Sequence, residues 1–151
     1  MLERADADWL FRLAQENDHY LTRGGIEGSQ LYGNRTLLAI CLDAQVPNVR
    51  RYAIQHRDEM VGEMTAYTDR PDNSVEVGYW VSRHHRGMGI ATRALGLLIE
   101  PLSLEQPRIK AEVYPSNRPS IGVLERNGFT EDKNTKRCNG MSTYRHDRSH
   151  Q

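Results

Sequence analysis

The sequence predicts an α/β domain with a mixed sheet, and three observations point to that class. The chain has 151 residues, a length typical of one domain with its own hydrophobic core. Stretches of helical periodicity alternate with stretches rich in β-branched and aromatic residues. Their order is helices, then strands, then strand–helix–strand–helix–strand, which is typical of helices packed on a central sheet. We therefore expect residues 1–151 to form a single domain.

Two helices are expected before the first strand. Apolar residues fall on one face of a helix over Asp6–Asn17, and Asp6 is a suitable N-cap. The glycine-rich stretch Arg23–Ser29 is a flexible break. Leucine and isoleucine spacing then predicts a second helix over Ser29–Ala44.

Three strands follow in close succession. Alternation of apolar with charged residues predicts a strand over Arg50–Arg57, with Glu59–Tyr67 as its neighbour. The polar stretch Asp69–Ser74 has the composition of a turn. The β-branched and aromatic stretch Val75–Val81 is the third strand.

The remaining elements alternate between helix and strand. A helix is predicted over Gly89–Glu100, and we expect Pro101 to end it. A strand at Arg108–Val113 precedes a helix over Pro119–Asn127 and a left-handed C-cap glycine at 128. The last strands are expected from Phe129 onward and over Met141–Arg145, and residues 146–151 are expected to fray.

Composition excludes several classes of protein. Twenty basic and twenty acidic residues give a formal net charge of zero, which argues against a nucleic-acid binder. No apolar run approaches a membrane span, and the N-terminus lacks a signal-peptide pattern. Cys41 and Cys138 lack metal-ligand spacing, and the adjacent His84 and His85 would point in opposite directions on an extended segment. We expect a cytoplasmic protein without a metal site.

The stretch RGMGIA, Arg86–Ala91, lies between a predicted strand and a predicted helix. The first turn of a helix has amides without helical acceptors and the positive end of the helix dipole. Glycines at 87 and 89 let the backbone approach an anion closely, and Arg86 adds positive charge. The pattern is neither a Walker loop nor a full dinucleotide fingerprint. The alternative interpretation is a glycine-rich turn with solvated arginines.

Two blocks resemble the GNAT superfamily of N-acetyltransferases. In VEVGYWVSRHHRGMGIATRALGLLIE, Val75–Glu100, the family signature Arg/Gln-x-x-Gly-x-Gly/Ala is matched by Arg86, Gly89 and Ala91. The second block, NRPSIGVLERNGF, covers Asn117–Phe129. The amino-acid sequence of the two blocks is most similar to the branch that acetylates ribosomal-protein N-termini and to its polyamine-acetylating relatives. The resemblance implies a central, mixed, mostly antiparallel sheet flanked by helices.

The resemblance also implies how acetyl-CoA would bind as co-substrate. The loop would hold the pyrophosphate through backbone amides, and the strand Tyr79–Val81 would separate from the next strand to pair with the pantetheine arm. The Val81 amide would polarise the thioester carbonyl. Asn117 would contact pantetheine, and Ser120 would hydrogen-bond the departing thiolate. The implied cofactor-binding residues are Tyr79, Trp80, Val81, Arg86, Gly87, Met88, Gly89, Ile90, Ala91, Thr92, Asn117 and Ser120.

Two residues are candidates for catalysis. Glu76 lies where some family members carry a glutamate base, and alternation places it on the face of Gly78 and Trp80. Alternatively it is a strand glutamate in a cross-strand ion pair. Glu63, on the neighbouring strand, is a weaker candidate as a second base or as a group that orients the amine. Ser120 is the candidate acid, because Leu124 replaces the family's tyrosine; otherwise Ser120 is a first-turn residue without a chemical role.

The predicted function is transfer of an acetyl group from acetyl-CoA to a primary amine: a protein N-terminus, a polyamine or another small amine. The alternatives are a non-catalytic acyl-CoA-binding or regulatory module and a nucleotide-phosphate binder outside the family. Because the chain begins MLERADAD, we expect the family's first strand to be short or missing, and a partner chain in a homodimer could cover the exposed edge. The segment from Lys133 to Gly140 is shorter and more polar than the family's penultimate hairpin.

Overall fold

A computed structural model describes residues 1–17, 48–68 and 71–147. Their centre is a six-stranded sheet in the order β1-β2-β3-β4-β6-β5. All neighbouring strands run antiparallel except β3 and β4, which are parallel. The predicted mixed, mostly antiparallel sheet is therefore confirmed. The strands are β1 (Val49–His56), β2 (Glu59–Tyr67), β3 (Val75–Val81), β4 (Arg108–Val113), β5 (Thr130–Glu131) and β6 (Ser142–Asp147).

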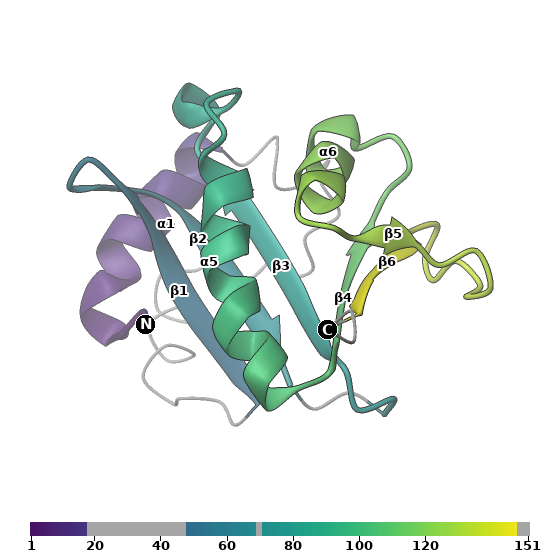
Figure 1. The fold of residues 1–151 in the computed structure, drawn as a ribbon. Helices are drawn as coiled ribbons and strands as arrows, with labels where there is room; N and C mark the ends of the chain where they lie inside the picture. Colours follow the sequence, from purple (N-terminus) through teal and green to yellow (C-terminus); the bar gives the residue numbers. More distant parts are fainter. Residues whose placement is uncertain (18–47, 69–70, 148–151) are drawn as a thin grey trace.

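Helices cover both faces of the sheet (Figure 1). On one face lie α5 (Ile90–Glu105) and α6 (Arg118–Arg126), which contact each other. On the other lies α1 (Ala7–Glu16), which follows a short 3-10 turn, η1 (Arg4–Asp6). A second 3-10 turn, η2 (Arg83–His85), connects β3 to the loop before α5.

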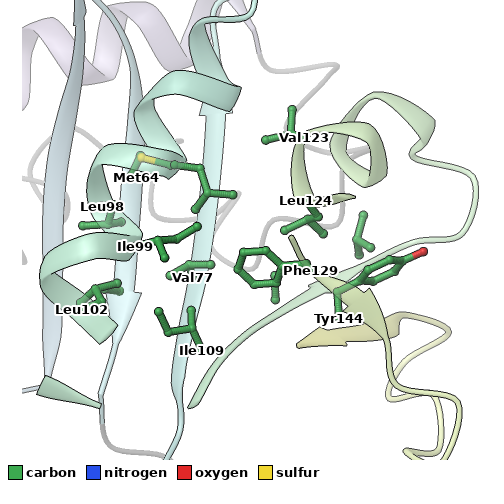
Figure 2. Packing of buried hydrophobic residues seen from close by; sticks show 14 of the residues in the cluster. Met64, Val77, Leu98, Ile99, Leu102, Ile109, Val123, Leu124, Phe129 and Tyr144 are labelled. Carbon is green, nitrogen blue, oxygen red and sulfur yellow. The ribbon is translucent and has the colours of Figure 1, made fainter. Parts of the chain in front are cut away.

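The main core lies between the sheet and the α5–α6 face (Figure 2). Phe129, which follows α6, has 2% of its surface exposed and lies close to Val77 and Ile109 from neighbouring strands. Leu124 of α6 and Leu102 of α5 are equally well buried. This cluster draws residues from every strand between β1 and β6 in the sheet, and only the edge strand β5 contributes none.

The second core lies under α1. Leu10 is fully buried there, and it packs with Trp80 of β3 and with small residues of the helix. Val77 and Val81 point into the main core, so Trp80 is on the opposite face of β3, as the alternation predicts. Tyr79 packs against the main core, which confirms that Tyr79 and Trp80 face opposite ways.

Three details of the sequence-based assignment are wrong. Pro101 lies inside α5 rather than after it, because Leu102 carries the buried stripe onward while Pro101 itself is exposed. Asp6 precedes α1, but its carboxylate accepts from the Glu3 amide at 2.8 Å and does not cap the helix. Strand β6 continues to Asp147, so pairing with β4 extends into the predicted tail.

Two expectations concern the N-terminal third. No strand precedes α1 in the described residues, and the Leu2 amide donates to the Arg51 carbonyl of β1 at 2.8 Å. In the described residues, this single hydrogen bond to β1 stands where the family has its first strand. The break at Arg23–Ser29 and the helix predicted over Ser29–Ala44 lie outside the described residues.

Candidate functional site

The sheet separates between β3 and β4. The ladder joining these strands consists of Val75 with Ile109 and Glu76 with Lys110. From Val77 to Val81, β3 pairs only with β2 among the described strands, and it diverges from β4 toward the end where α5 begins (Figure 1). The separation that the family resemblance implies for Tyr79–Val81 is therefore present.

The loop after β3 has two residues with left-handed backbone. Gly87 has φ of 72° and Gly89 has φ of 73°, a region that side-chain-bearing residues rarely adopt. A Cβ at Gly87 would meet nothing within 4 Å, so backbone conformation, not crowding, requires glycine there. His84 and His85 lie in the 3-10 turn, so the extended segment expected for them is wrong.

The loop delivers amides to the start of α5. The first helical bond runs from the Arg93 amide to the Gly89 carbonyl at 3.1 Å, so the amides of residues 90–92 have no helical acceptor. The first turn holds no acidic residue, and Arg86 is exposed beside it. The guanidinium of Arg93 donates to the Met88 carbonyl at 3.2 Å and braces the loop. This arrangement suits an anion such as a phosphate.

The N-terminus of α6 lies across from the separated part of β3. Asn117 caps the helix, because its Oδ1 accepts from the Ser120 amide at 3.3 Å. The Tyr79 hydroxyl lies 3.0 Å from Ser120 Oγ and 3.1 Å from the Ser120 carbonyl oxygen. Three of the predicted site residues, Tyr79, Asn117 and Ser120, are therefore brought together from segments about forty residues apart in sequence.

Comparison with known families decides what this arrangement belongs to. The family model described as "Acetyltransferase (GNAT) domain" matches residues 1–130. The chain belongs to the GNAT acetyltransferase family. The predicted family resemblance is confirmed.

Curated relatives match part of this GNAT chain. An uncharacterized N-acetyltransferase p20 from Bacillus licheniformis is 34% identical over 82 residues, which are 52% of this chain and 46% of that protein. The ribosomal-protein-serine acetyltransferase of Escherichia coli is 34% identical over 83 residues, 53% of this chain and 46% of that protein. The matches thus span about half the length of these relatives.

Solved structures match nearly the whole chain. RimL, a ribosomal L7/L12 alpha-N-protein acetyltransferase in complex with coenzyme A, has a TM-score of 0.82 at 20% identity, over 97% of this chain and 90% of that one. Mycobacterium smegmatis RimJ, in complex with CoA-disulfide, has a TM-score of 0.75 at 25% identity, over 97% and 79%. These likenesses confirm the GNAT fold.

The candidate acidic residues of the GNAT site differ in accessibility. Glu63 is 1% exposed; its carboxylate accepts from Arg51 at 2.5 Å and from the Trp80 indole at 3.2 Å. Such a buried, engaged carboxylate cannot reach an amine substrate. Glu76 is half-buried on the same face, at the point where the β3–β4 ladder ends. The Trp80 side chain is held in the α1 core, so its main chain is the part that faces the separation.

Sequence reasoning missed Asn127 at the C-terminus of α6. Its Nδ2 donates to the Thr92 carbonyl at 3.1 Å and to the Val123 carbonyl at 2.9 Å. A Cβ at Gly96 would lie 3.1 Å from Asn127 Oδ1, so a glycine at 96 makes room for this amide. The contact ties α6 to the first turn of α5. The spacing of the two sequence blocks does not predict this contact.

The described part of the GNAT domain lacks two further features. Within residues 1–17, 48–68 and 71–147, no three histidine, cysteine, aspartate or glutamate side chains gather as metal ligands would. None of the helices described in those ranges is both long enough and apolar enough to cross a membrane.

Proposed function

We propose that this GNAT protein transfers an acetyl group from acetyl-CoA to a primary amine. The observation that carries the proposal is the backbone cradle at residues 86–92, which opens α5 beside the place where β3 and β4 separate. A diphosphate suits the exposed amides of the α5 first turn, and an extended pantetheine arm suits a strand edge without a neighbouring strand. Bound there, acetyl-CoA would supply an activated acyl group.

The protein's own residues take distinct roles in the proposed reaction. The Val81 amide hydrogen-bonds the thioester carbonyl and stabilises the negative charge that develops on its oxygen. The Asn117 Oδ1 caps α6, which leaves its Nδ2 as the donor toward pantetheine. Ser120 donates a hydrogen bond to the departing sulfur. Positioning of the two reactants supplies much of the acceleration.

Glu76 is the proposed base that removes a proton from the amine. It lies five residues before Val81, about 16 Å along an extended strand at about 3.3 Å per residue. Because a base acts within hydrogen-bond reach or through a single water, this separation requires a chain of several waters between Glu76 and an amine at the thioester. Its register partners in the two neighbouring strands are Tyr67 and Lys110. If Glu76 serves only in an ion pair, Glu76→Gln should leave kcat unchanged.

The acceptor is proposed only as a class. The names of similar proteins include ribosomal-protein acetyltransferases and an aminoglycoside acetyltransferase, AAC(6')-Ib. Both kinds of acceptor present a primary amine, which fits a protein N-terminus, a polyamine or another small amine here. Cytoplasmic location and a homodimer stay predictions.

Cofactor binding is tested by Gly89→Val, with binding of CoA followed by calorimetry. Valine at φ of 73° is strained and places a side chain at the cradle, so we expect at least a tenfold loss of affinity. Gly140→Val is the control for backbone strain, because Gly140 has φ of 81° in the loop before β6, outside residues 86–92, and CoA should bind normally. Normal CoA affinity of Gly89→Val, or displacement of CoA by ATP, would contradict the proposal.

Turnover is tested with acetyl-CoA and a panel of amines that includes peptides, polyamines and aminoglycosides, by following thiol release. Glu76→Gln should lower kcat at pH 7 by about tenfold to a hundredfold, with unchanged CoA affinity. Glu131→Gln, on the far edge strand β5, is the control. Unchanged turnover in Glu76→Gln removes this residue from the mechanism. Binding of CoA without turnover of any amine would make the protein an acyl-CoA-binding module.

A further inference from the structure

The contact between Tyr79 and Ser120 joins the two sides of the separated sheet. Tyr79 comes from β3 beyond the last pair with β4, and Ser120 comes from the first turn of α6. The phenol lies 3.0 Å from Ser120 Oγ and 3.1 Å from the Ser120 carbonyl oxygen, and its ring packs against the main core. The Asn117 cap fixes the Ser120 backbone from the other side. Both hydroxyls are therefore held in place.

Counting hydrogens gives this pair two arrangements. A phenol has one hydrogen to donate, and a carbonyl oxygen can only accept. When Tyr79 donates to the Ser120 carbonyl, the Ser120 hydrogen can point back to the phenol oxygen. When Tyr79 donates to Ser120 Oγ, the Ser120 hydrogen must point elsewhere. The two arrangements differ by rotation of two hydrogens and need no movement of heavy atoms.

The second arrangement improves Ser120 as a donor. A hydroxyl that accepts one hydrogen bond becomes a stronger donor in the next, because chains of hydrogen bonds polarise one another. An anionic acceptor gains most from such a donor. We propose that Tyr79 is a positioning residue that directs the Ser120 hydroxyl hydrogen toward the thiolate sulfur of CoA. This rests on the proposed function; the protons stay on their oxygens, and the thiolate is protonated later from solvent.

The first experiment measures the thiol of bound CoA without any turnover. The ultraviolet absorbance of the thiolate is followed as a function of pH for the complex of CoA with the wild type, Tyr79→Phe and Ser120→Ala. If Tyr79 directs the serine hydrogen to sulfur, the thiol pKa is higher in both variants than in the wild type, because each stabilises the thiolate less. An unchanged thiol pKa in Tyr79→Phe overturns the proposal, whether or not an amine acceptor has been found.

The second experiment separates positioning from tethering. In Tyr79→Phe we expect kcat to fall about tenfold, with the KM for acetyl-CoA within about twofold. In the Ser120→Ala background, the same tyrosine change should have no further effect on kcat, because its target is gone. A tether between β3 and α6 would instead weaken CoA binding and stability, and leave kcat unchanged. Equal effects in the two backgrounds, or a KM effect alone, overturn the proposal.

Tyr52→Phe is the matched control. Tyr52 is also a half-buried tyrosine packed against the main core, but it lies on β1, away from Ser120. Its loss of a hydroxyl should leave kcat and the thiol pKa unchanged. A wild type that binds CoA with a lowered thiol pKa but acetylates no amine would contradict the proposed enzyme while sustaining the role of Tyr79. Acetylation of an amine by the wild type, with kcat and the thiol pKa unchanged in Tyr79→Phe, would support the proposed enzyme and contradict the role of Tyr79.

Discussion

The two halves of the sheet are held together in different ways. In the first half, β1 to β3, antiparallel ladders pair eight residues, with a register shift between Ile54 and Gln55, and then six. In the second half, β4 and β6 pair six residues, but only two pairs join β4 to β3. Side chains therefore connect the halves where backbone pairs are missing. Because the cradle and the α6 N-terminus lie at this junction, a change that loosens it should affect both stability and cofactor binding, whereas an equal change inside the first half should affect stability alone.

The largest expected effect is at Phe129, whose ring fills the core across the junction (Figure 2). Phe129→Ala should lower the free energy of unfolding by about 3–5 kcal/mol, measured by urea denaturation, and should weaken CoA binding. Leu10→Ala, at the fully buried leucine of the α1 cluster, is the matched change on the other face, with a cost of about 2–5 kcal/mol and normal CoA affinity. If the two variants lose CoA affinity equally, the junction has no special role.

Within the first half, two adjacent arginines make a sharper comparison. The Arg51–Glu63 pair is buried, with 16% and 1% of the side chains exposed, whereas Arg50–Glu105 is exposed at 37% and 48%. Arg51→Ala removes the guanidinium from a buried carboxylate and should cost about 3 kcal/mol of unfolding free energy. Arg50→Ala should cost at most about 1 kcal/mol.

Urea denaturation of both variants at pH 7 measures this difference. CoA affinity should be unchanged in Arg50→Ala, because Glu105 lies at the end of α5 that is far from the cradle. Equal unfolding free energies for the two variants would show that burial does not set the cost.

A smaller effect is expected at Asn127, which joins α6 to α5. Asn127→Ala removes its bond to the Thr92 carbonyl, at a cost of about 1 kcal/mol of stability. Because Thr92 belongs to the first turn of α5, CoA affinity should fall about fivefold, measured by calorimetry. Glu125→Ala, at an exposed position of the same helix, should change neither quantity. A normal CoA affinity in Asn127→Ala would mean that α5 holds the cradle unaided.

What the sequence predicts well is local. The glycines of the loop and the alternation of β3 are set by neighbouring residues, so the cradle and the faces of the strand could be anticipated. The helix ending expected at Pro101 was wrong because burial of Leu102 outweighs a local preference of about 3 kcal/mol.

What the sequence does not predict is contact between distant segments. Tyr79 with Ser120 spans 41 residues and Asn127 with Thr92 spans 35, and each depends on how helices settle on the sheet. The burial of Glu63 has the same origin, because the alternation of β2 does not show that Arg51 and Trp80 enclose the carboxylate. One of two candidate bases thus became inaccessible only once the layers were assembled.

The smallest effect concerns Asp72, at the end where the halves stay joined. Hydrogen bonds from Ser74, then from Lys110 of β4, lower the Asp72 pKa to about 2. Its folded pKa lies below the usual value of 3.8, so its contribution to stability is complete above about pH 4 and is lost as the pH falls toward 2. The wild type should therefore exceed Asp72→Asn in stability at pH 6, and the difference should vanish near pH 2.

Asp132 provides the control for the junction. Thr135 and Arg145 lower its pKa to about 2 as well, and both partners belong to the second half, although Arg145 Nη1 also lies 3.9 Å from Asp72 Oδ2. In urea denaturation, Asp132→Asn should therefore also be less stable than the wild type at pH 6, and this difference should vanish near pH 2. Only Asp72→Asn should speed amide hydrogen exchange at Ile109 and Lys110, the β4 residues that pair with β3. Faster exchange there in both variants would mean that acidic groups stabilise the sheet as a whole rather than the join between its halves.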